Sequence, residues 1–136
     1  ENLVTIAGDI HGFYAAELHP DFDNPEEPIA AEFTVAGISS RAIQQLTYDS
    51  VSGDEVLVAL GLLDLVPRAD EILTSANPHY RYNNSNANGL GLFEVGAGGV
   101  DVEFVMVGDV TNEVDDGERD STRFRVAAGS SRILAG

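Results

Sequence analysis

The sequence predicts a mixed fold of the α/β (α+β) class, with several short strands and a few helices. Two short apolar runs, residues 3–7 and 29–35, are typical of strands. Residues 55–66 are apolar over the length of a helix, and residues 100–107 alternate between apolar and polar, as half-buried strands do. With 136 residues, 43% of them hydrophobic, the chain is a single domain or a fragment of a larger one.

The first element is the apolar run at residues 3–7, which we expect to be a buried strand. Gly8-Asp9-Ile10-His11-Gly12 follows directly, at the kind of strand end where open α/β folds place their chemistry. Asp9 and His11 supply a carboxylate and an imidazole, both common ligands of catalytic metals. The glycines predict a sharp turn that a ligand can approach closely. The alternative is a plain turn with a capping Asp and a surface His.

The next segment, residues 13–18, is either a second strand or a turn of helix, and Pro20 ends it. An acidic, proline-containing loop is expected at residues 21–28, and a strand at residues 29–35. A turn at residues 37–40 then offers a possible cap for a short helix at residues 41–46.

A longer helix is predicted at residues 55–66, with Asp54 as its N-cap and Pro67 as its stop. It is apolar nearly all round, so we expect it to be buried.

The last part of the chain predicts a hairpin, with arms at residues 89–95 and 100–107 joined across a glycine-rich turn. In the second arm Val102 and Phe104 share a face with other apolar residues, and Asp101 and Glu103 share the opposite face. Residues 108–121 lack one of the alternate oxygen ligands of a calcium loop, so they predict a solvated acidic loop. A last strand is expected at residues 122–127.

The charge balance excludes some functions. Twenty-three acidic residues outnumber seven basic ones, all of them Arg, and the net charge of -16 argues against a nucleic-acid or anionic membrane surface. This charge fits a protein that is kept soluble in high salt or one that meets divalent cations. There is no cysteine and no apolar stretch long enough to cross a membrane. No signal-peptide pattern or methionine opens the chain, so we expect a processed or partial protein.

Four segments in register resemble one family, the PhoD-like alkaline phosphatases of the metallophosphatase superfamily. Residues 7–18 resemble its Gly-Asp-Val-His segment, and residues 32–40 its Glu-Phe…Ser-Ile-Ser-Ser segment. Asn77-Pro78-His79 and the glycine-led strand at residues 91–93 resemble its later segments, although the family's usual Tyr is replaced by Leu92-Phe93. Together they cover most of residues 3–107 and correspond to the C-terminal part of the catalytic domain.

The resemblance implies two β-sheets packed face to face and flanked by helices. It implies hydrolysis of phosphomonoesters or phosphodiesters, iron and calcium as metals, and a periplasmic or extracellular location. The family's earlier metal-binding segments have no counterpart here, so the partner implied is the N-terminal remainder of the same enzyme. The isolated chain is then expected to be inactive.

The resemblance also implies roles for single residues. Asp9 would bind a metal, and His11 would bind a metal or the phosphate, or donate a proton to the leaving oxygen. His79 and Asn77 are the candidates for substrate binding, with a backbone-bonded loop His and a turn cap as their alternatives. For Arg81 we favour a structural salt bridge over a phosphate contact, and His19 is expected at the surface.

A second reading belongs to another class of protein. The chain would be a secreted structural or calcium-binding domain that keeps a phosphatase-like fold without the chemistry. Its acidic, lysine-free, β-rich sequence suits either reading.

Overall fold

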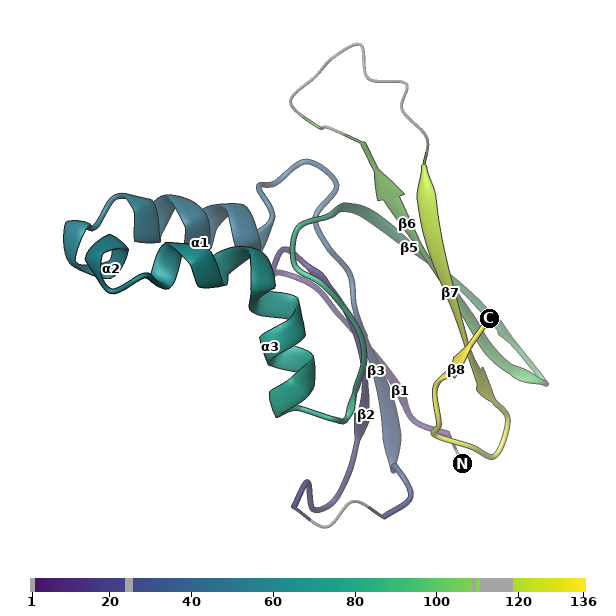
Figure 1. The fold of residues 1–136 in the computed structure, drawn as a ribbon. Coiled ribbons are helices and arrows are strands. Elements are labelled where there is room, and N and C mark those ends of the chain that lie inside the picture. The colour runs from purple at the N-terminus through teal and green to yellow at the C-terminus, as the bar shows by residue number, and fades with distance from the viewer. Residues whose placement is uncertain (1, 24–25, 109, 111–118) are drawn as a thin grey trace.

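The fold consists of two four-stranded sheets and a group of helices, in a computed structural model that describes residues 2–23, 26–108, 110 and 119–136 (Figure 1). The first sheet has the order β1 (Val4–Ala7), β3 (Ala30–Thr34), β2 (Phe13–Leu18), β4 (Tyr80–Asn84). The second sheet has the order β5 (Asn88–Gly96), β6 (Gly99–Val107), β7 (Asp120–Ala127), β8 (Leu134–Ala135). The mixed fold class predicted from the sequence is confirmed.

The strand predictions hold, and the ambiguous segment at residues 13–18 is a strand. β1 runs parallel to β3, whereas β2 pairs antiparallel with both β3 and β4. In the second sheet the predicted hairpin is present, with Gly96 opposite Gly99. Gly99 has φ 132°, and a Cβ there would come 2.1 Å from the carbonyl oxygen of Val126, so only glycine fits this corner.

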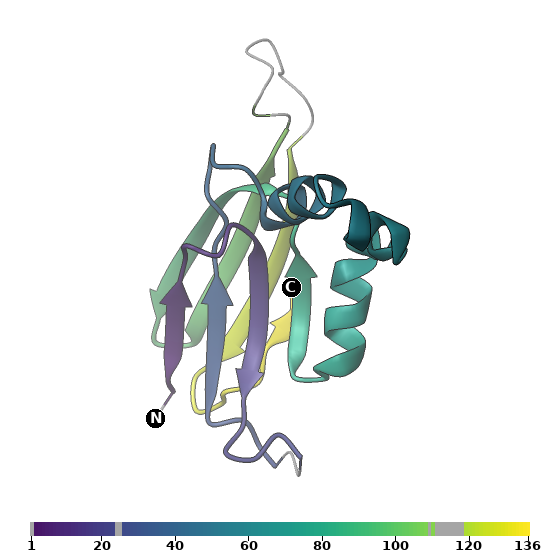
Figure 2. The same ribbon diagram turned by 90° about the vertical axis from the view of Figure 1, so that its left-hand side faces the viewer.

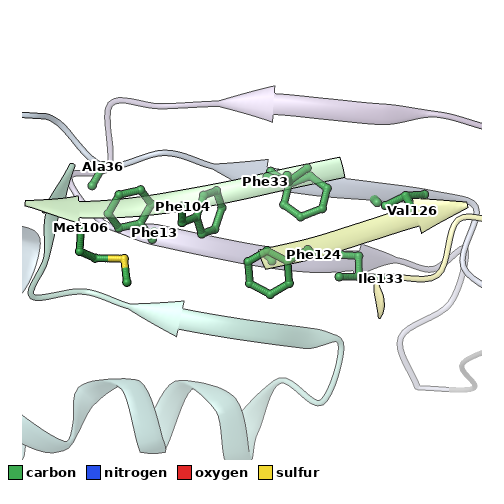
Figure 3. Close-up of a cluster of buried hydrophobic side chains, with 11 residues drawn as sticks. Phe13, Phe33, Ala36, Phe104, Met106, Phe124, Val126 and Ile133 are labelled. Carbon is green, nitrogen blue, oxygen red and sulfur yellow. The ribbon is translucent and has the colours of Figure 1, made fainter. Parts of the chain in front are cut away.

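The core lies between the two sheets, which face one another in Figure 2. Phe13 and Phe33 come from the first sheet, and Phe104 and Phe124 from the second, and all four rings are buried. Phe104 packs against Phe13 with ring centroids 4.8 Å apart and against Phe124 at 5.4 Å. Figure 3 shows these rings meeting in the space between strands of both sheets. The alternation predicted in β6 is correct, because Val102, Phe104 and Met106 face this core.

The helical segment comprises α1 (Ile43–Ser52), α2 (Glu55–Ala59), the 3-10 helix η1 (Leu62–Arg68) and α3 (Ala69–Ala76). α1 is longer than the predicted helix, and Ala42 precedes it without a side-chain cap. The predicted N-cap at Asp54 is confirmed, since its carboxylate accepts hydrogen bonds from the N–H groups of Val56 and Leu57. These elements gather beside β4, with α1 and α2 extending away from the sheets (Figures 1 and 2).

The prediction of one buried helix at residues 55–66 is wrong. Gly61 adopts φ 76° and divides the stretch into α2 and η1. No residue of α2 is buried, and Val56 and Leu60 are 66% and 69% exposed. An apolar pattern indicates which side chains favour burial, but the elements that would bury them are set by the tertiary fold. None of the helices in the described ranges has the length and apolarity to cross a bilayer.

The predicted burial of residues 3–7 is also incorrect, although the strand itself is confirmed. β1 is the outermost strand of its sheet, and the Ile6 side chain is 61% exposed. The expected acidic loop at residues 108–121 falls mostly on positions 109 and 111–118, which lie outside the described residues.

Candidate functional site

The turn at residues 8–12 connects the carboxyl end of β1 to the start of β2. Asp9 and His11 both have left-handed backbone conformations, with φ angles of 73° and 60°. The sequence suggested that the two glycines would make the sharp turn, but neither Gly8 nor Gly12 has a positive φ. The strain therefore falls on the two residues whose side chains carry the chemistry, a pattern that is common at functional sites.

His11 is held at two points by the segment that leads into α1. The ring Nδ1 of His11 lies 2.8 Å from the carbonyl oxygen of Arg41. The backbone carbonyl oxygen of His11 accepts a hydrogen bond from the N–H of Ile43 at 2.9 Å. A carbonyl only accepts, so Nδ1 is the nitrogen that donates a proton to it, and the neutral form of this imidazole would carry its lone pair on Nε2. Nε2 has no hydrogen-bond partner among the described residues. Metal-binding histidines commonly have this arrangement, with one nitrogen anchored to the protein and the other open.

Asp9 presents an exposed carboxylate on the same turn. It makes no hydrogen bond or ion pair with any described residue. The residue types and the open Nε2 of His11 fit a metal or a phosphate, but the described residues contain no group of three or more His, Cys, Asp or Glu able to hold an ion. What the structure describes thus offers two possible ligands on one turn.

Gly12 lies close to the phenol of Tyr14. A Cβ at position 12 would come 2.9 Å from the hydroxyl oxygen of Tyr14. Burial, with the nearby Asp70 carboxylate as a second cause, raises the pKa of Tyr14, so the phenol stays protonated. A side chain at position 12 would therefore require the Tyr14 ring to shift.

We expect glycine to be better tolerated than alanine at both strained positions. The left-handed conformation costs a residue with a Cβ roughly 1–2 kcal/mol, and glycine avoids that cost. Asp9→Gly and His11→Gly should therefore be more stable than Asp9→Ala and His11→Ala by about 1 kcal/mol each. Urea unfolding of the four variants measures this difference. Equal stabilities would show that residues 9 and 11 are not in the left-handed conformation in solution.

His79 and Asn77 lie at the other end of the first sheet. The carbonyl of His79 accepts a hydrogen bond from the N–H of Glu17, so His79 lies beside Glu17. Glu17 comes six residues after His11 in the chain. At the usual rise per strand residue, roughly 20 Å therefore separates the two histidines. Asn77 is the C-cap of α3, and its side-chain amide donates to the carbonyl of Leu73 at 3.0 Å. Within this chain these two residues do not share a site with Asp9 and His11.

A pocket of about 490 Å³ surrounds His79. The ring of His79 packs on Phe22 and on Tyr80, with centroids 4.5 Å and 4.8 Å away. Arg81 and Arg132 also line this pocket, but each already pairs with a carboxylate, Glu17 and Glu27 respectively. The predicted salt bridge of Arg81 is confirmed. Because both guanidinium groups are paired with carboxylates, less positive charge is available in this pocket to bind an anion such as a phosphate.

Sequence reasoning missed the buried carboxylate beneath this pocket. Glu17 is 1% exposed, and it accepts from the guanidinium of Arg81 at 2.5 Å and from the N–H of Ile133 at 2.8 Å. His19 was expected at the surface, but its side chain is buried, with Nδ1 2.9 Å from the carbonyl oxygen of Glu26. A charged residue within an apolar strand, Ala15-Ala16-Glu17-Leu18, was the available signal.

His79 predicts a specific pH dependence of stability. Burial, with the charge of His19 as a lesser cause, lowers the pKa of His79 below 6.5. The unfolded chain then binds the proton more tightly, so the stabilisation by neutral His79 is complete above pH 6.5 and is lost as the pH falls toward the lowered value. Thermal unfolding between about pH 7.5 and pH 5 should show a smaller acid loss in His79→Gln than in the unmodified chain. An equal or larger loss in the variant would contradict this assignment.

Comparisons with known proteins give three results. The family described as PhoD-like phosphatase matches residues 1–104. No curated protein matches the chain. A solved structure titled "Structure of PhoD" superimposes with a TM-score of 0.60 at 17% identity, over 97% of this chain and 22% of that chain. This chain thus spans about a fifth of the solved protein, and the structural likeness, at that identity, concerns the fold.

Proposed function

The chain belongs to the PhoD-like phosphatase family, and from this premise we propose that it forms one part of a metal-dependent phosphoric ester hydrolase. The observation that carries the proposal is the turn at residues 8–12. It carries a carboxylate and an anchored imidazole two residues apart at the end of a strand, within the span that the family match covers. The finer fold assignment, part of a metallophosphatase sandwich, belongs to the same proposal.

We assign the two side chains of the turn complementary roles. The Asp9 carboxylate would hold a metal, for which the resemblance implies iron or calcium. When bound, such a metal lowers the pKa of a water molecule and offsets charge on the phosphoryl oxygens. His11, with its proton fixed on Nδ1 by Arg41, would present Nε2 to a metal or, when protonated, to a phosphoryl or leaving oxygen. Further ligands would come from outside this chain.

His79 and Asn77 remain predictions as substrate-contacting residues. They lie in a separate pocket, so any contact with a substrate would involve a part of the molecule remote from the turn. Export from the cytoplasm, to the periplasm or the outside of the cell, is likewise proposed from the resemblance and from the net charge of -16.

The function is tested with Asp9→Ala in the complete enzyme. We expect hydrolysis of an aryl phosphate ester to fall at least ~100-fold, because loss of a ligand impairs metal binding and positioning. Asp64→Ala, at an exposed aspartate of η1, is the matched control and should leave the rate unchanged. Undiminished hydrolysis by Asp9→Ala would remove Asp9 from the site.

Elemental analysis of the same protein separates the enzyme from the second reading, a secreted structural or calcium-binding domain. Stoichiometric iron or another transition metal, lost in Asp9→Ala, supports the enzyme. Calcium alone, removed by mild dialysis and unaffected by Asp9→Ala, supports the binding domain.

A further inference from the structure

The loop at residues 35–42 carries the carbonyl that orients His11. It connects β3 to α1, and its residues, all of them described, form neither helix nor strand. Backbone groups in such a segment have no ladder of hydrogen bonds to hold them in place. Arg41 is exposed, and its guanidinium pairs with Asp49 at the surface, where ion pairs contribute little. The position of the Arg41 carbonyl therefore depends on contacts made elsewhere in the loop.

A side chain from the second sheet makes these contacts. Asn88 is the first residue of β5 and is 7% exposed. Its Nδ2 donates to the carbonyl oxygen of Gly37 at 2.8 Å and to the carbonyl oxygen of Ser40. The N–H of Gly89 donates to the same Gly37 oxygen at 3.2 Å. The start of β5 thus holds the loop at two carbonyls, and the second belongs to the residue directly before Arg41.

The far end of the loop is held as well, where α1 begins. The N–H of Ile43 donates to the backbone carbonyl oxygen of His11 at 2.9 Å. The next N–H, that of Gln44, donates to the carbonyl oxygen of Ser85 at 3.0 Å. Arg41 therefore lies between two fixed points of the backbone, one held by β5 and the other by the turn and the end of β4.

The contacts at position 88 select an amide side chain. Both neighbours are carbonyl oxygens, which accept and do not donate, so the group that faces them is the NH2 end of the amide. An aspartate of the same shape would present an oxygen instead, and an apolar side chain would leave both carbonyls without this donor. Asparagine is otherwise uncommon in strands. The loop that Asn88 holds, and not the strand that it begins, therefore explains this residue type.

We propose that Asn88 is a positioning residue of the phosphatase site, which acts on the reaction through the Arg41 carbonyl and the imidazole of His11. The inference rests on the proposed function and adds a residue to its site. With the loop held, the carbonyl keeps a proton on Nδ1 and leaves Nε2 open to a metal or a phosphoryl oxygen.

Loss of the Asn88 contacts has a defined consequence for His11. The Arg41 carbonyl moves away from Nδ1, and the ring turns. The neutral imidazole then takes the form with its proton on Nε2, which a histidine side chain favours in water. In that form Nε2 has no lone pair to offer to a metal.

The test compares Asn88→Asp with the unmodified chain by ¹⁵N NMR of the histidine rings at about pH 8.5, where imidazole is neutral. The substitution exchanges an NH2 group for an oxygen and so removes both donors. We expect the His11 proton on Nδ1 in the unmodified chain and on Nε2 in Asn88→Asp. Amide hydrogen exchange at Ile43, whose N–H donates to His11, should become at least ~10-fold faster. The spectrum of His11→Ala assigns the His11 signals among the three histidines.

Asn83→Asp is the matched control. Asn83 lies in β4, and its side-chain amide donates to the hydroxyl of Thr74 at 2.5 Å and to the carbonyl of Asp70 at 3.4 Å, both in α3. The substitution therefore removes comparable hydrogen bonds from another part of the first sheet. It should leave the His11 proton on Nδ1. Asn88→Ser, which keeps one O–H donor, should give a mixture of the two forms.

Hydrolysis by the complete enzyme supplies a second readout. Asn88→Asp should lower the rate with an aryl phosphate ester about 10–100-fold, because a small displacement of a reacting group is costly. In His11→Ala the same substitution should lower the rate no further, since Asn88 acts through the imidazole that is already missing. A residue with a merely structural role would lower the rate in both backgrounds. Asn83→Asp should leave the rate unchanged.

Four results would overturn the role of Asn88. They are a folded Asn88→Asp that keeps the His11 proton on Nδ1, the same proton shift in Asn83→Asp, a further loss of rate in the His11→Ala background, and an unchanged rate although the proton shifts. Circular dichroism shows whether each variant is folded. If Asn88→Asp does not fold, Asn88→Ser decides, and an unchanged His11 in that variant counts against the role.

Failure of the proposed function gives a different result. The NMR measurement does not depend on activity. A proton shift in Asn88→Asp, together with an unmodified complete protein that hydrolyses no phosphate ester, would support the hold of Asn88 on His11 and count against the function alone.

Discussion

Replacing His11 by alanine should lower phosphate ester hydrolysis by the complete enzyme by about 10²–10⁴-fold, the usual contribution of a positioned proton donor or acceptor. The expectation follows from its geometry. The carbonyl of Arg41 fixes a proton on Nδ1, so Nε2 is the nitrogen left without a hydrogen-bond partner among the described residues. Steady-state rates with an aryl phosphate ester give the measurement, and a pH profile separates loss of a titrating group from general damage to the fold.

His11→Gly provides the control for backbone strain. It removes the same imidazole but relaxes a backbone held at φ 60°. Both variants should lose activity equally, although the glycine variant is the more stable. Activity that survived in His11→Gly would show that the imidazole is not required, and that the loss in His11→Ala comes from backbone strain.

Replacing Phe104 by alanine should destabilise the isolated chain by about 3–5 kcal/mol, a large share of the stability of a small domain. Phe104 is fully buried. Its ring contacts those of Phe13, Phe33, Tyr82 and Phe124, with centroids between 4.8 and 6.1 Å away. Three of these rings come from the first sheet, so the cavity would open between the sheets, where the backbone cannot collapse to fill it.

Phe22→Ala is the matched control, because Phe22 is 53% exposed and its ring contacts only those of His19 and His79 among the described residues. It should cost no more than ~1.5 kcal/mol in urea unfolding. Equal costs for the two substitutions would show that Phe104 is not at the centre of the core.

Local pattern was enough to predict most of the strands and the hairpin. The alternation around Val102 and Phe104 is a property of neighbouring residues, and the cap at Asp54 acts on the next three residues. Burial was predicted less well, as the exposed Val56 and Ile6 show. Whether an apolar side chain is buried depends on which elements pack on it, and that information does not lie within the segment itself.

The candidate site shows the same division. Asp9 and His11 were predicted because their residue types and spacing are local. The carbonyl of Arg41 that orients His11 lies thirty residues further along the chain and is a backbone group, so its residue type gives no signal. The separation of His79 from the turn follows from the antiparallel pairing of β2 with β4, which places residue 79 beside Glu17 and not beside His11.

The buried Glu17 carboxylate shows that the packed fold extends beyond the residues of the family match. The family match stops at residue 104, in the middle of β6. Yet Ile133 supplies one of the hydrogen bonds to Glu17, and Phe124 and Val126 complete the core. A chain cut at residue 104 would keep every residue of the family match and lose the Ile133 hydrogen bond to the buried Glu17 carboxylate. The segment that the family match covers is therefore shorter than the segment that packs into this core.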